Sequence, residues 1–333
     1  MELPPTARPL VIAHRGASGY RPEHSRAAYD LALDMGVDAV EPDIVATADG
    51  VLVLRHENEI SGTTDVASRP EFAGRRTTKL IDGQKLTGWF TEDFTWLELK
   101  TLRVRERLPK LRSRSFDGED GILRLTDLID LLDARGSVAM VAEVKHASYF
   151  ASIGLPLDEL LAAELSGAGW ENDPRLIIEC FETTVLGQLR RRGIAATYVF
   201  LLESTGAPAD EVAAHGGDAR PFSSYLTDVG LAGLAASGID GISVDKRLLL
   251  VTDAAGRVTG TTDLVARAHA AGLAVFCWTL RAENAFLPKN LRRAGGPREF
   301  GQWRDEFELI MRAGLDGVFA DQPDLAIEVR ASL

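Results

Sequence analysis

A recurring unit organises the apolar and polar positions along the chain: a helical stretch, a glycine, and then a short apolar run. The runs are rich in valine and isoleucine and do not alternate cleanly with polar residues. Such runs are typical of parallel strands that are covered on both faces. A glycine just past a helix supplies the left-handed conformation that ends many helices. The repetition therefore predicts a parallel sheet flanked by helices. The glycines of this unit are Gly36, Gly136, Gly193, Gly238, Gly272 and Gly314.

Nine segments qualify as strands, one more than a closed eightfold α/β barrel needs. The second and third are joined only by the turn ATADG, which is too short for a crossover helix. We therefore expect a hairpin excursion there, and a TIM-type (β/α)8 barrel that spans residues 1–333 as a single domain. An open doubly wound sheet is the alternative, but HRGAS after the first strand lacks the GxGxxG spacing of a dinucleotide-binding fold. The expected strands are 10–14, 38–44, 51–55, 138–144, 175–181, 196–202, 239–244, 273–279 and 316–320.

Residues 57–120 break this rhythm, since they are polar and rich in turn residues. We expect a small inserted subdomain that leaves after the third strand and therefore lies near the catalytic face of the barrel. The insertion ends in the basic run RVRERLPKLRSR. We interpret this run as a solvated face, and help with a phosphate is the alternative. Its basic residues are Arg103, Arg105, Arg107, Lys110, Arg112 and Arg114.

Charge and composition narrow the class of protein. The 333 residues carry a formal net charge of −12, which argues against binding to nucleic acid or docking on anionic lipid. Local charge still decides what a cleft attracts, so an anionic small molecule remains possible as a substrate. No run approaches the length of a membrane span, so no stable membrane insertion is expected. The oligomeric state is not readable.

The two cysteines and the N-terminal residues bear on the cellular compartment. Cys180 and Cys277 lie in apolar, strand-like runs, so we expect buried free thiols and no disulfide framework. The first residues, MELPPTARPLVIAHRG, show no charged segment followed by an apolar stretch. We therefore expect no signal peptide and favour a cytoplasmic location, with export as the alternative if a leader has been removed.

Acidic residues interrupt the strands at the end where barrel enzymes place their chemistry. Glu41 and Asp43 lie two residues apart, and the period of a strand puts them on one face. Glu143 ends the next major strand. Three such carboxylates need a compensating charge, and oxygen ligands favour Mg²⁺ or Ca²⁺ over zinc. The alternative is that two of these acids form ion pairs with Arg15 and Lys145.

Two histidines and two cationic side chains accompany these acids. His14 ends the first strand and His56 ends the third. Histidine titrates near neutral pH and can exchange a proton with a reacting oxygen. A structural role is the alternative for either ring. Arg15 and Lys145 are candidate ligands of a phosphate oxygen.

Two aromatic residues could line the same cavity. Phe181 and Trp278 end the fifth and eighth expected strands, where they could form a pocket wall or simply pack in the core. The segment WTLRAEN places Arg281 and Glu283 just beyond the eighth expected strand, where they could meet a polar head group.

The order of these motifs resembles that of the glycerophosphodiester phosphodiesterase family. The segments that carry the resemblance are AHRGASGYRPEHS, EPD, the strand that ends in His56, EVK, IIECF, WTLRAEN and DGVFADQPD. Segments of the predicted insertion, TTDVASRPEFAGRRT and GWFTEDFTWLELKTLR, resemble the subdomain of that family's longer, periplasmic-type members.

This resemblance implies a TIM-type barrel that hydrolyses glycerophosphodiesters to sn-glycerol 3-phosphate and an alcohol. It implies that Glu41, Asp43 and Glu143 ligate a metal and that His14 and His56 form an acid–base pair. It also implies phosphate contacts from the residues matching Arg15 and Lys145. Calcium is favoured over magnesium, because longer members with the insertion typically use it.

The chain departs from the family's usual pattern at three places. Glu57 stands where an aspartate usually follows the second histidine, PEHS replaces PENT or PEHT, and EVKHA lacks a proline. Two other functions are alternatives: a phosphodiesterase that resembles sphingomyelinase D and acts on lipids, and a catalytically silent family member that serves as a binding module.

Overall fold

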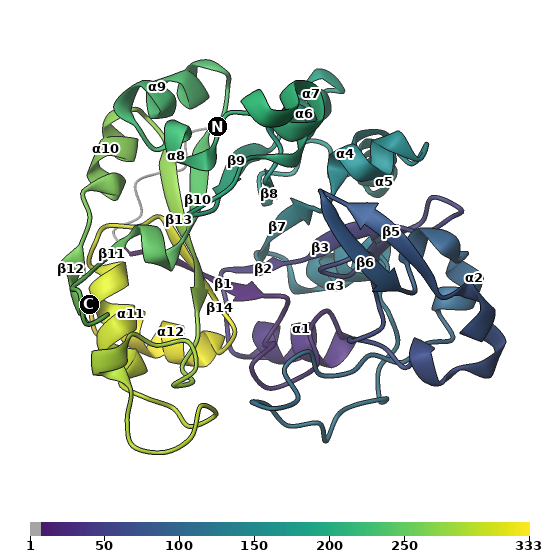
Figure 1. The fold of residues 1–333 in the computed structure, drawn as a ribbon, viewed down its shortest axis with the longest axis horizontal. Coiled ribbons are helices and arrows are strands. Elements are labelled where there is room, and N and C mark those ends of the chain that lie inside the picture. Colours follow the sequence, from purple (N-terminus) through teal and green to yellow (C-terminus); the bar gives the residue numbers. More distant parts are fainter. Residues whose placement is uncertain (1–7) are drawn as a thin grey trace.

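Eight parallel strands close into a barrel in the computed structural model, which describes residues 8–333 (Figure 1). Around the barrel the strand order is β1, β14, β13, β10, β9, β8, β7 and then the pair β3 and β2, and pairing of β2 with both β7 and β1 completes the circle. The predicted TIM-type barrel is therefore confirmed. The barrel strands are β1 (Leu10–His14), β2 (Ala39–Glu41), β3 (Asp43–Ala46), β7 (Ala139–Val144), β8 (Leu176–Cys180), β9 (Thr197–Leu202), β10 (Gly241–Asp245), β13 (Ala274–Leu280) and β14 (Gly317–Ala320).

One barrel strand is interrupted, and this explains the surplus strand in the sequence. β2 and β3 are two parts of one strand, separated at Pro42, which has no N–H to give to a ladder. β4 (Leu52–Leu54) pairs antiparallel with β3 outside the parallel circle. The expected hairpin excursion is thus present at the predicted pair of strands.

Helices surround the barrel and follow the strands, as the repeating unit predicted. All six glycines of that unit have positive φ angles, between 80° and 89°, which a residue with a Cβ rarely adopts. The α-helices are α1 (Arg26–Asp34), α2 (Trp96–Leu99), α3 (Leu125–Arg135), α4 (Ala147–Ser152), α5 (Leu157–Ala168), α6 (Thr183–Arg191), α7 (Ala209–His215), α8 (Phe222–Tyr225), α9 (Asp228–Ala236), α10 (Leu264–Ala270), α11 (Trp303–Met311) and α12 (Pro323–Ala331).

The chain between β4 and α3 forms a separate feature beside the barrel. It contains the antiparallel hairpin of β5 (Thr77–Ile81) and β6 (Gln84–Gly88), and α2 lies next to it on the side of the molecule away from α10 and α11 (Figure 1). Apolar residues of this segment, such as Phe72 and Phe94, join the main hydrophobic core. The limits 57–120 of an inserted subdomain remain a prediction. A second hairpin, β11 (Leu250–Thr252) and β12 (Val258–Thr261), precedes α10.

A small apolar layer fills the inside of the barrel and positions the site above it. Its buried members include Ile12, Val141 and Ile177. Side chains two residues apart on a strand face the same way, so each of these residues is followed by an inward-facing polar residue nearer the C-terminal rim. The pairs of layer and rim residues are Ile12 and His14, Ala39 and Glu41, Val141 and Glu143, Ile177 and Glu179, Phe276 and Trp278, and Phe319 and Asp321.

The cysteines and the helices bear on two further expectations within residues 8–333. Cys180 and Cys277 are both free and buried, as predicted. No helix within residues 8–333 is long and apolar enough to cross a membrane. Residues 1–7, on which the expectation about a signal peptide partly rests, lie outside the described residues.

Candidate active site

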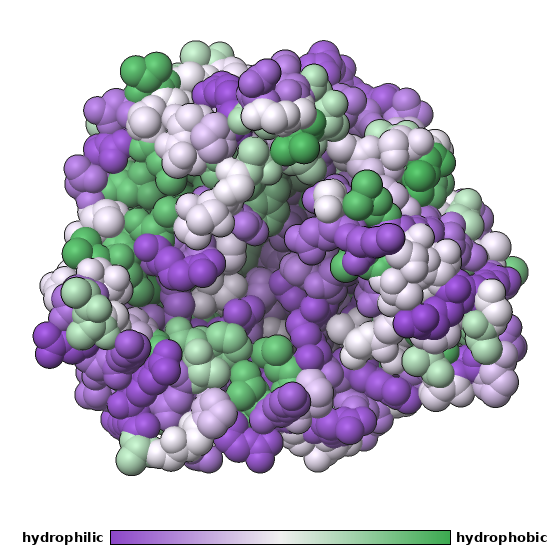
Figure 2. Space-filling model, viewed as in Figure 1, coloured by the Kyte–Doolittle hydropathy of each residue, from purple (hydrophilic) through white to green (hydrophobic). Residues whose placement is uncertain are grey.

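A hollow at the C-terminal rim of the barrel collects most of the predicted site residues. Hydrophilic residues gather in the hollow at the centre of the face shown in Figure 2, and the cavity there has a volume of about 770 Å³. Buried Asp43 and Glu283 do not line it. The predicted residues that do are His14, Arg15, Glu41, His56, Glu143, Lys145, Phe181, Trp278 and Arg281.

Three buried glutamates meet at the floor of this cavity. Glu41, Glu143 and Glu179 each offer one carboxylate oxygen, and these oxygens lie within 4.8 Å of one another. Glu143 and Glu179 are register partners across β7 and β8, which brings their side chains together. Glu179 is not among the residues predicted from the sequence, because it lies within the otherwise apolar segment IIECF.

Asp43 is adjacent to these glutamates but has other partners. Its Oδ2 accepts a hydrogen bond from His24 Nε2 at 2.9 Å and forms an ion pair with Arg15 Nε at 2.9 Å. Its Oδ1 lies 3.6 Å from Lys145 Nζ and has no hydrogen-bond partner. Asp43 and Glu143 are also register partners across β3 and β7. The predicted ion pairs with Arg15 and Lys145 therefore exist, and Oδ1 of Asp43 is still open to a ligand.

The pKa values of these acids indicate that too little positive charge surrounds them. Burial raises the pKa of Glu41 and of Glu179 well above the usual range, and that of Glu143 to about 8, with neighbouring carboxylates adding to the effect. Burial would also raise the pKa of Asp43, but Arg15 and Lys145 hold it well below the usual range.

These four acids fit a divalent cation. Within residues 8–333, Arg15 and Lys145 are the cationic side chains that lower the pKa values of these acids most strongly. A doubly charged ion would balance the remainder when all four are ionised. Oε1 of Glu41 and Oε2 of Glu179 are buried without a hydrogen-bond partner, as expected of oxygens that await a hard cation.

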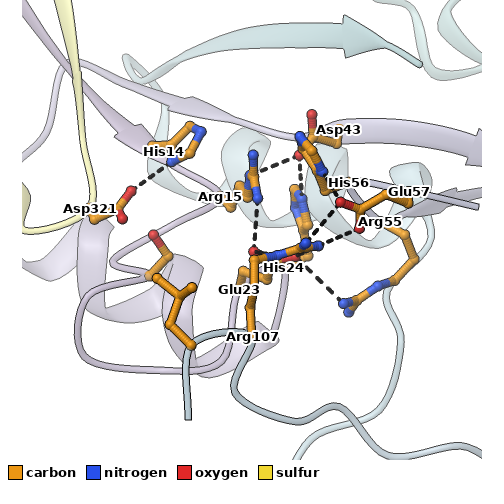
Figure 3. A network of polar contacts seen from close by, with 12 residues as sticks. His14, Arg15, Glu23, His24, Asp43, Arg55, His56, Glu57, Arg107 and Asp321 are labelled. Atoms are coloured by element: carbon orange, nitrogen blue, oxygen red, sulfur yellow. Dashed lines mark hydrogen bonds and ion pairs between the residues drawn. The ribbon is translucent and has the colours of Figure 1, made fainter. Parts of the chain in front are cut away.

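Each predicted histidine is held by a carboxylate (Figure 3). His14 Nδ1 lies 2.6 Å from Oδ1 of Asp321, which follows β14, and His56 Nδ1 lies 2.5 Å from Oε1 of Glu57. The longer side chain of Glu57 thus reaches the ring in place of the family's usual aspartate. A carboxylate accepts the Nδ1 proton of a neutral ring, so each Nε2 is left with its lone pair.

Burial lowers the pKa of both rings. Burial and the nearby Arg15 lower the pKa of His14 to about 4. Burial, Arg15 and Lys145 lower the pKa of His56 to about 3. Both rings are therefore neutral at pH 7 and can accept a proton, and the negative charge of a bound phosphodiester would favour protonation of one of them.

Cationic and aromatic side chains surround the histidines. Arg15 is fixed by Glu23, which accepts a hydrogen bond from Nη1 at 2.9 Å. Lys145 donates to Glu143 at 2.7 Å and lies over the ring of Phe181, with 5.6 Å between Nζ and the ring centroid. The rings of Phe181 and Trp278 meet edge to face at 5.9 Å, so they form a wall of the cavity, as their positions had suggested.

The two residues of WTLRAEN differ in their placement. Arg281 lines the cavity and donates from Nε to Asp321 at 2.6 Å. Glu283 is buried outside the cavity lining, where Oε1 accepts hydrogen bonds from Arg112 at 2.8 Å and from Gln322 at 3.1 Å. Glu283 therefore holds an arginine rather than facing the cavity.

The basic run also differs from its expected role as a solvated face. Arg103, Lys110 and Arg114 are exposed, as expected. That interpretation is wrong for Arg107 and Arg112, whose side chains are only 25% and 7% exposed and form ion pairs inside the site. No local pattern distinguishes them from their neighbours in the sequence.

One rim of the barrel carries an acid cluster that fits a cation, two histidines held by carboxylates, and cationic groups. These are the parts of a metal-assisted phosphodiester hydrolase. The profile of the glycerophosphoryl diester phosphodiesterase family matches residues 14–325. A glycerophosphodiester phosphodiesterase of Arabidopsis thaliana is 31% identical over 95% of this chain and 84% of its own length. The chain belongs to the glycerophosphoryl diester phosphodiesterase family and is a phosphodiester hydrolase that acts on glycerophosphodiesters.

Solved structures show the same fold. A candidate glycerophosphoryl diester phosphodiesterase from Silicibacter pomeroyi superposes with a TM-score of 0.69 at 22% identity, covering 99% of this chain and 95% of the other. A phosphodiesterase from Oleispira antarctica, solved with the product sn-glycerol-3-phosphate, gives a TM-score of 0.62 at 19% identity and covers 97% and 96% of the two chains.

Proposed function

We propose that this chain cleaves glycerophosphodiesters to sn-glycerol 3-phosphate and an alcohol, with His14 and His56 as its proton-transfer pair. The convergence of Glu41, Glu143 and Glu179 beside both histidines in one cavity supports this proposal most directly. The product bound to the Oleispira antarctica relative is consistent with the same outcome here.

The cation would be held by Glu41, Asp43 and Glu143, with Glu179 as a fourth carboxylate. We favour Ca²⁺, with Mg²⁺ as the alternative, because Ca²⁺ accepts more carboxylate oxygens, in less regular geometry, than Mg²⁺ does. When bound, the ion would supply Lewis-acid stabilisation of charge on the phosphoryl oxygens.

The protein's own groups account for binding and orientation. Arg15 uses Nε and Nη1 for Asp43 and Glu23, so Nη2 is left to donate to a phosphate oxygen. Lys145 presents a charged ammonium at the same rim. Phe181 and Trp278 would hold the apolar part of the substrate and exclude water from one side.

The histidines would move the protons. One takes a proton from the nucleophile as its oxygen bonds to phosphorus, and the other gives a proton to the alkoxide that leaves when the second P–O bond breaks. The nucleophile is either water or the 2-hydroxyl of the glycerol, which would give a transient cyclic phosphate.

An assay of product release tests this proposal. Purified protein should release glycerol 3-phosphate from glycerophosphocholine when Ca²⁺ is added, and a chelator should abolish the activity. Glu41→Ala, His14→Ala and His56→Ala should each lose activity while the fold is retained. Glu119→Gln, an exposed carboxylate of the chain between β4 and α3, is the matched control and should keep full activity.

The same assay separates the alternatives. Hydrolysis of sphingomyelin in preference to glycerophosphocholine would favour a lipid phosphodiesterase. Binding of glycerophosphocholine without turnover, at saturating Ca²⁺ or Mg²⁺, would favour a binding module and contradict the proposed reaction.

A further inference from the structure

The carboxylates that hold His14 and His56 come from opposite ends of the chain, yet one short coil reaches both. Glu57 follows β4, and Asp321 follows β14. Residues 107–112, in the coil between α2 and α3, place one guanidinium on each of these carboxylates. The two arginines are only five positions apart in the sequence.

Arg107 forms the first of these contacts. Its Nη1 and Nη2 donate to Oε1 and Oε2 of Glu57 at 2.8 and 2.6 Å, a two-bond arrangement that fixes the plane of the carboxylate. On its other side, Nε and Nη2 donate to the two oxygens of Glu23, each at 2.6 Å. Glu23 also accepts from Arg15, so Arg107 joins the His56 pair to the candidate phosphate ligand (Figure 3).

Arg112 forms the second contact. Its Nη2 donates to Oδ2 of Asp321 at 2.5 Å, while Oδ1 of the same carboxylate faces His14. Its Nε donates to Glu283 at 2.8 Å and its Nη1 to the carbonyl oxygen of Ser18 at 3.1 Å. All three nitrogens of the guanidinium are therefore occupied, and Asp321 cannot turn without breaking a buried ion pair.

The coil itself is braced. The N–H of Glu106 donates to Asp117 at 2.8 Å, and the N–H of Leu108 donates to the carboxylate of Glu106 at 2.7 Å. Arg107 and Leu108 both line the catalytic cavity. These contacts fix the direction in which the two arginines point.

We propose that the segment Arg107–Arg112 is a two-armed clamp that fixes the carboxylates behind both histidines, which makes Arg107 and Arg112 positioning residues of the reaction. The proposal rests on the proposed roles of His14 and His56. The chain between β4 and α3 then supplies residues that position the catalytic groups, and it is not merely a neighbouring subdomain. A carboxylate that can swing would let its imidazole ring leave the reactive orientation, and small misplacements of catalytic groups are costly.

The test compares substitutions at these positions with neighbours in the same coil. Arg107→Met and Arg112→Met remove the guanidinium but keep a long side chain. Arg107→Lys and Arg112→Lys keep the charge but lose the planar fork. Arg105→Met and Lys110→Met are controls, since the side chain of Arg105 donates a hydrogen bond to Ser68 at 3.2 Å and to neither histidine-holding carboxylate, and Lys110 is exposed.

For the two methionine variants we expect kcat on glycerophosphocholine to fall by about 10- to 100-fold, the usual scale for loss of an outer-shell partner. The calcium Kd of both variants, and the KM of Arg112→Met, should stay within about threefold. The lysine variants should recover less than half of the lost kcat, because a single ammonium cannot make the paired bonds. The controls should match the wild-type protein.

Chemical rescue separates positioning from stability. Millimolar guanidinium should raise kcat of Arg107→Ala severalfold without changing its Tm, and should not affect Arg105→Ala. The proposal is overturned if the methionine variants keep the wild-type kcat. It is also overturned if the loss of kcat parallels a loss of Tm or of calcium affinity and guanidinium does not restore kcat. Activity that survives His14→Ala and His56→Ala would instead overturn the proposed function.

Discussion

Glu143 and Glu179 stand opposite each other in register on β7 and β8, and both carboxylates are buried at the floor of the cavity. Two negative charges that are buried side by side, away from water, are unfavourable unless a cation lies between them. This pairing links the fold to the chemistry, because residues paired in register on neighbouring strands point to the same face of the sheet, which here is the inside of the barrel.

The first prediction concerns Glu179. Glu179→Gln should weaken calcium binding by about tenfold, since one charged oxygen is lost, as measured by titration calorimetry. The same change should raise the Tm of the chelated protein at neutral pH, because folding no longer has to protonate a buried carboxyl group whose pKa is raised. Unchanged calcium affinity would exclude Glu179 from the cation site. Glu119→Gln serves as the control for both measurements.

The second prediction concerns the partner of His14. Asp321→Asn keeps the size of the side chain but can no longer fix the Nδ1 tautomer by charge. We expect kcat to fall by about 10²- to 10⁴-fold, as for the acid of a catalytic triad, with calcium affinity unchanged. Steady-state kinetics with a parallel calcium titration tests this. A normal kcat would show that the Asp321 contact is structural.

The third prediction concerns pH. Burial raises the pKa of Glu143 from 4.5 to about 8 in the protein without a cation, so this group is protonated when folded and ionised when unfolded between these values. Its contribution to stability is fully present below pH 4.5 and is lost as the pH rises through about 8. His14 and His56 act in the opposite direction, but their contribution is lost only as the pH falls below 6.5.

Between pH 6.5 and 8 both histidines stay neutral, so the pH dependence of calcium binding reports on the acid cluster. The stability of the chelated protein also changes in this window through Glu106, Glu164 and Glu182, because burial raises the pKa of each to about 7. A cation must displace the proton of Glu143, so calcium affinity should rise with pH by up to about tenfold per unit for each proton released. The gain in Tm on adding calcium should grow across the same window. Titrations in buffers of different ionisation enthalpy count the protons, and affinity that is flat with pH would contradict the prediction.

The fourth prediction concerns the aromatic wall. Phe181→Ala should raise KM for glycerophosphocholine by about 2- to 10-fold, which corresponds to the loss of one aromatic contact. The value of kcat should change little, because the ring of Phe181 packs against Phe222 and Trp278 and not against a proton-transfer residue. A fall in kcat at constant KM would instead show that Phe181 acts mainly by holding Lys145.

Much of the barrel and of its polar rim could be predicted from the sequence. The helix–glycine–strand unit predicts the fold. Their position at the ends of apolar strands predicts His14, Glu41, His56 and Glu143 as site residues. The same criterion applies to Glu179 and Asp321, which also follow an inward-facing apolar residue by two positions. Predicting them requires knowing which face of each strand points into the barrel.

The remaining contacts could not be predicted from local pattern. Arg107 and Arg112 lie in coil, and only the path of the folded chain separates them from exposed Arg103 and Arg114. The two oxygens of Asp43 face different partners, since Oδ2 pairs with Arg15 and Oδ1 lies near Lys145. The spacing of residues along a strand cannot predict which oxygen faces which partner.

The proposed reaction requires that strand-end carboxylates hold one divalent cation beside the two histidines. The most direct measurement is the anomalous diffraction of crystals grown with Ca²⁺ or soaked in Mn²⁺. We predict a single strong peak within about 2.0–2.6 Å of carboxylate oxygens of Glu41, Glu143 and at least one of Asp43 and Glu179. The absence of a peak there at saturating metal, or a peak bound elsewhere on the chain, would contradict the account.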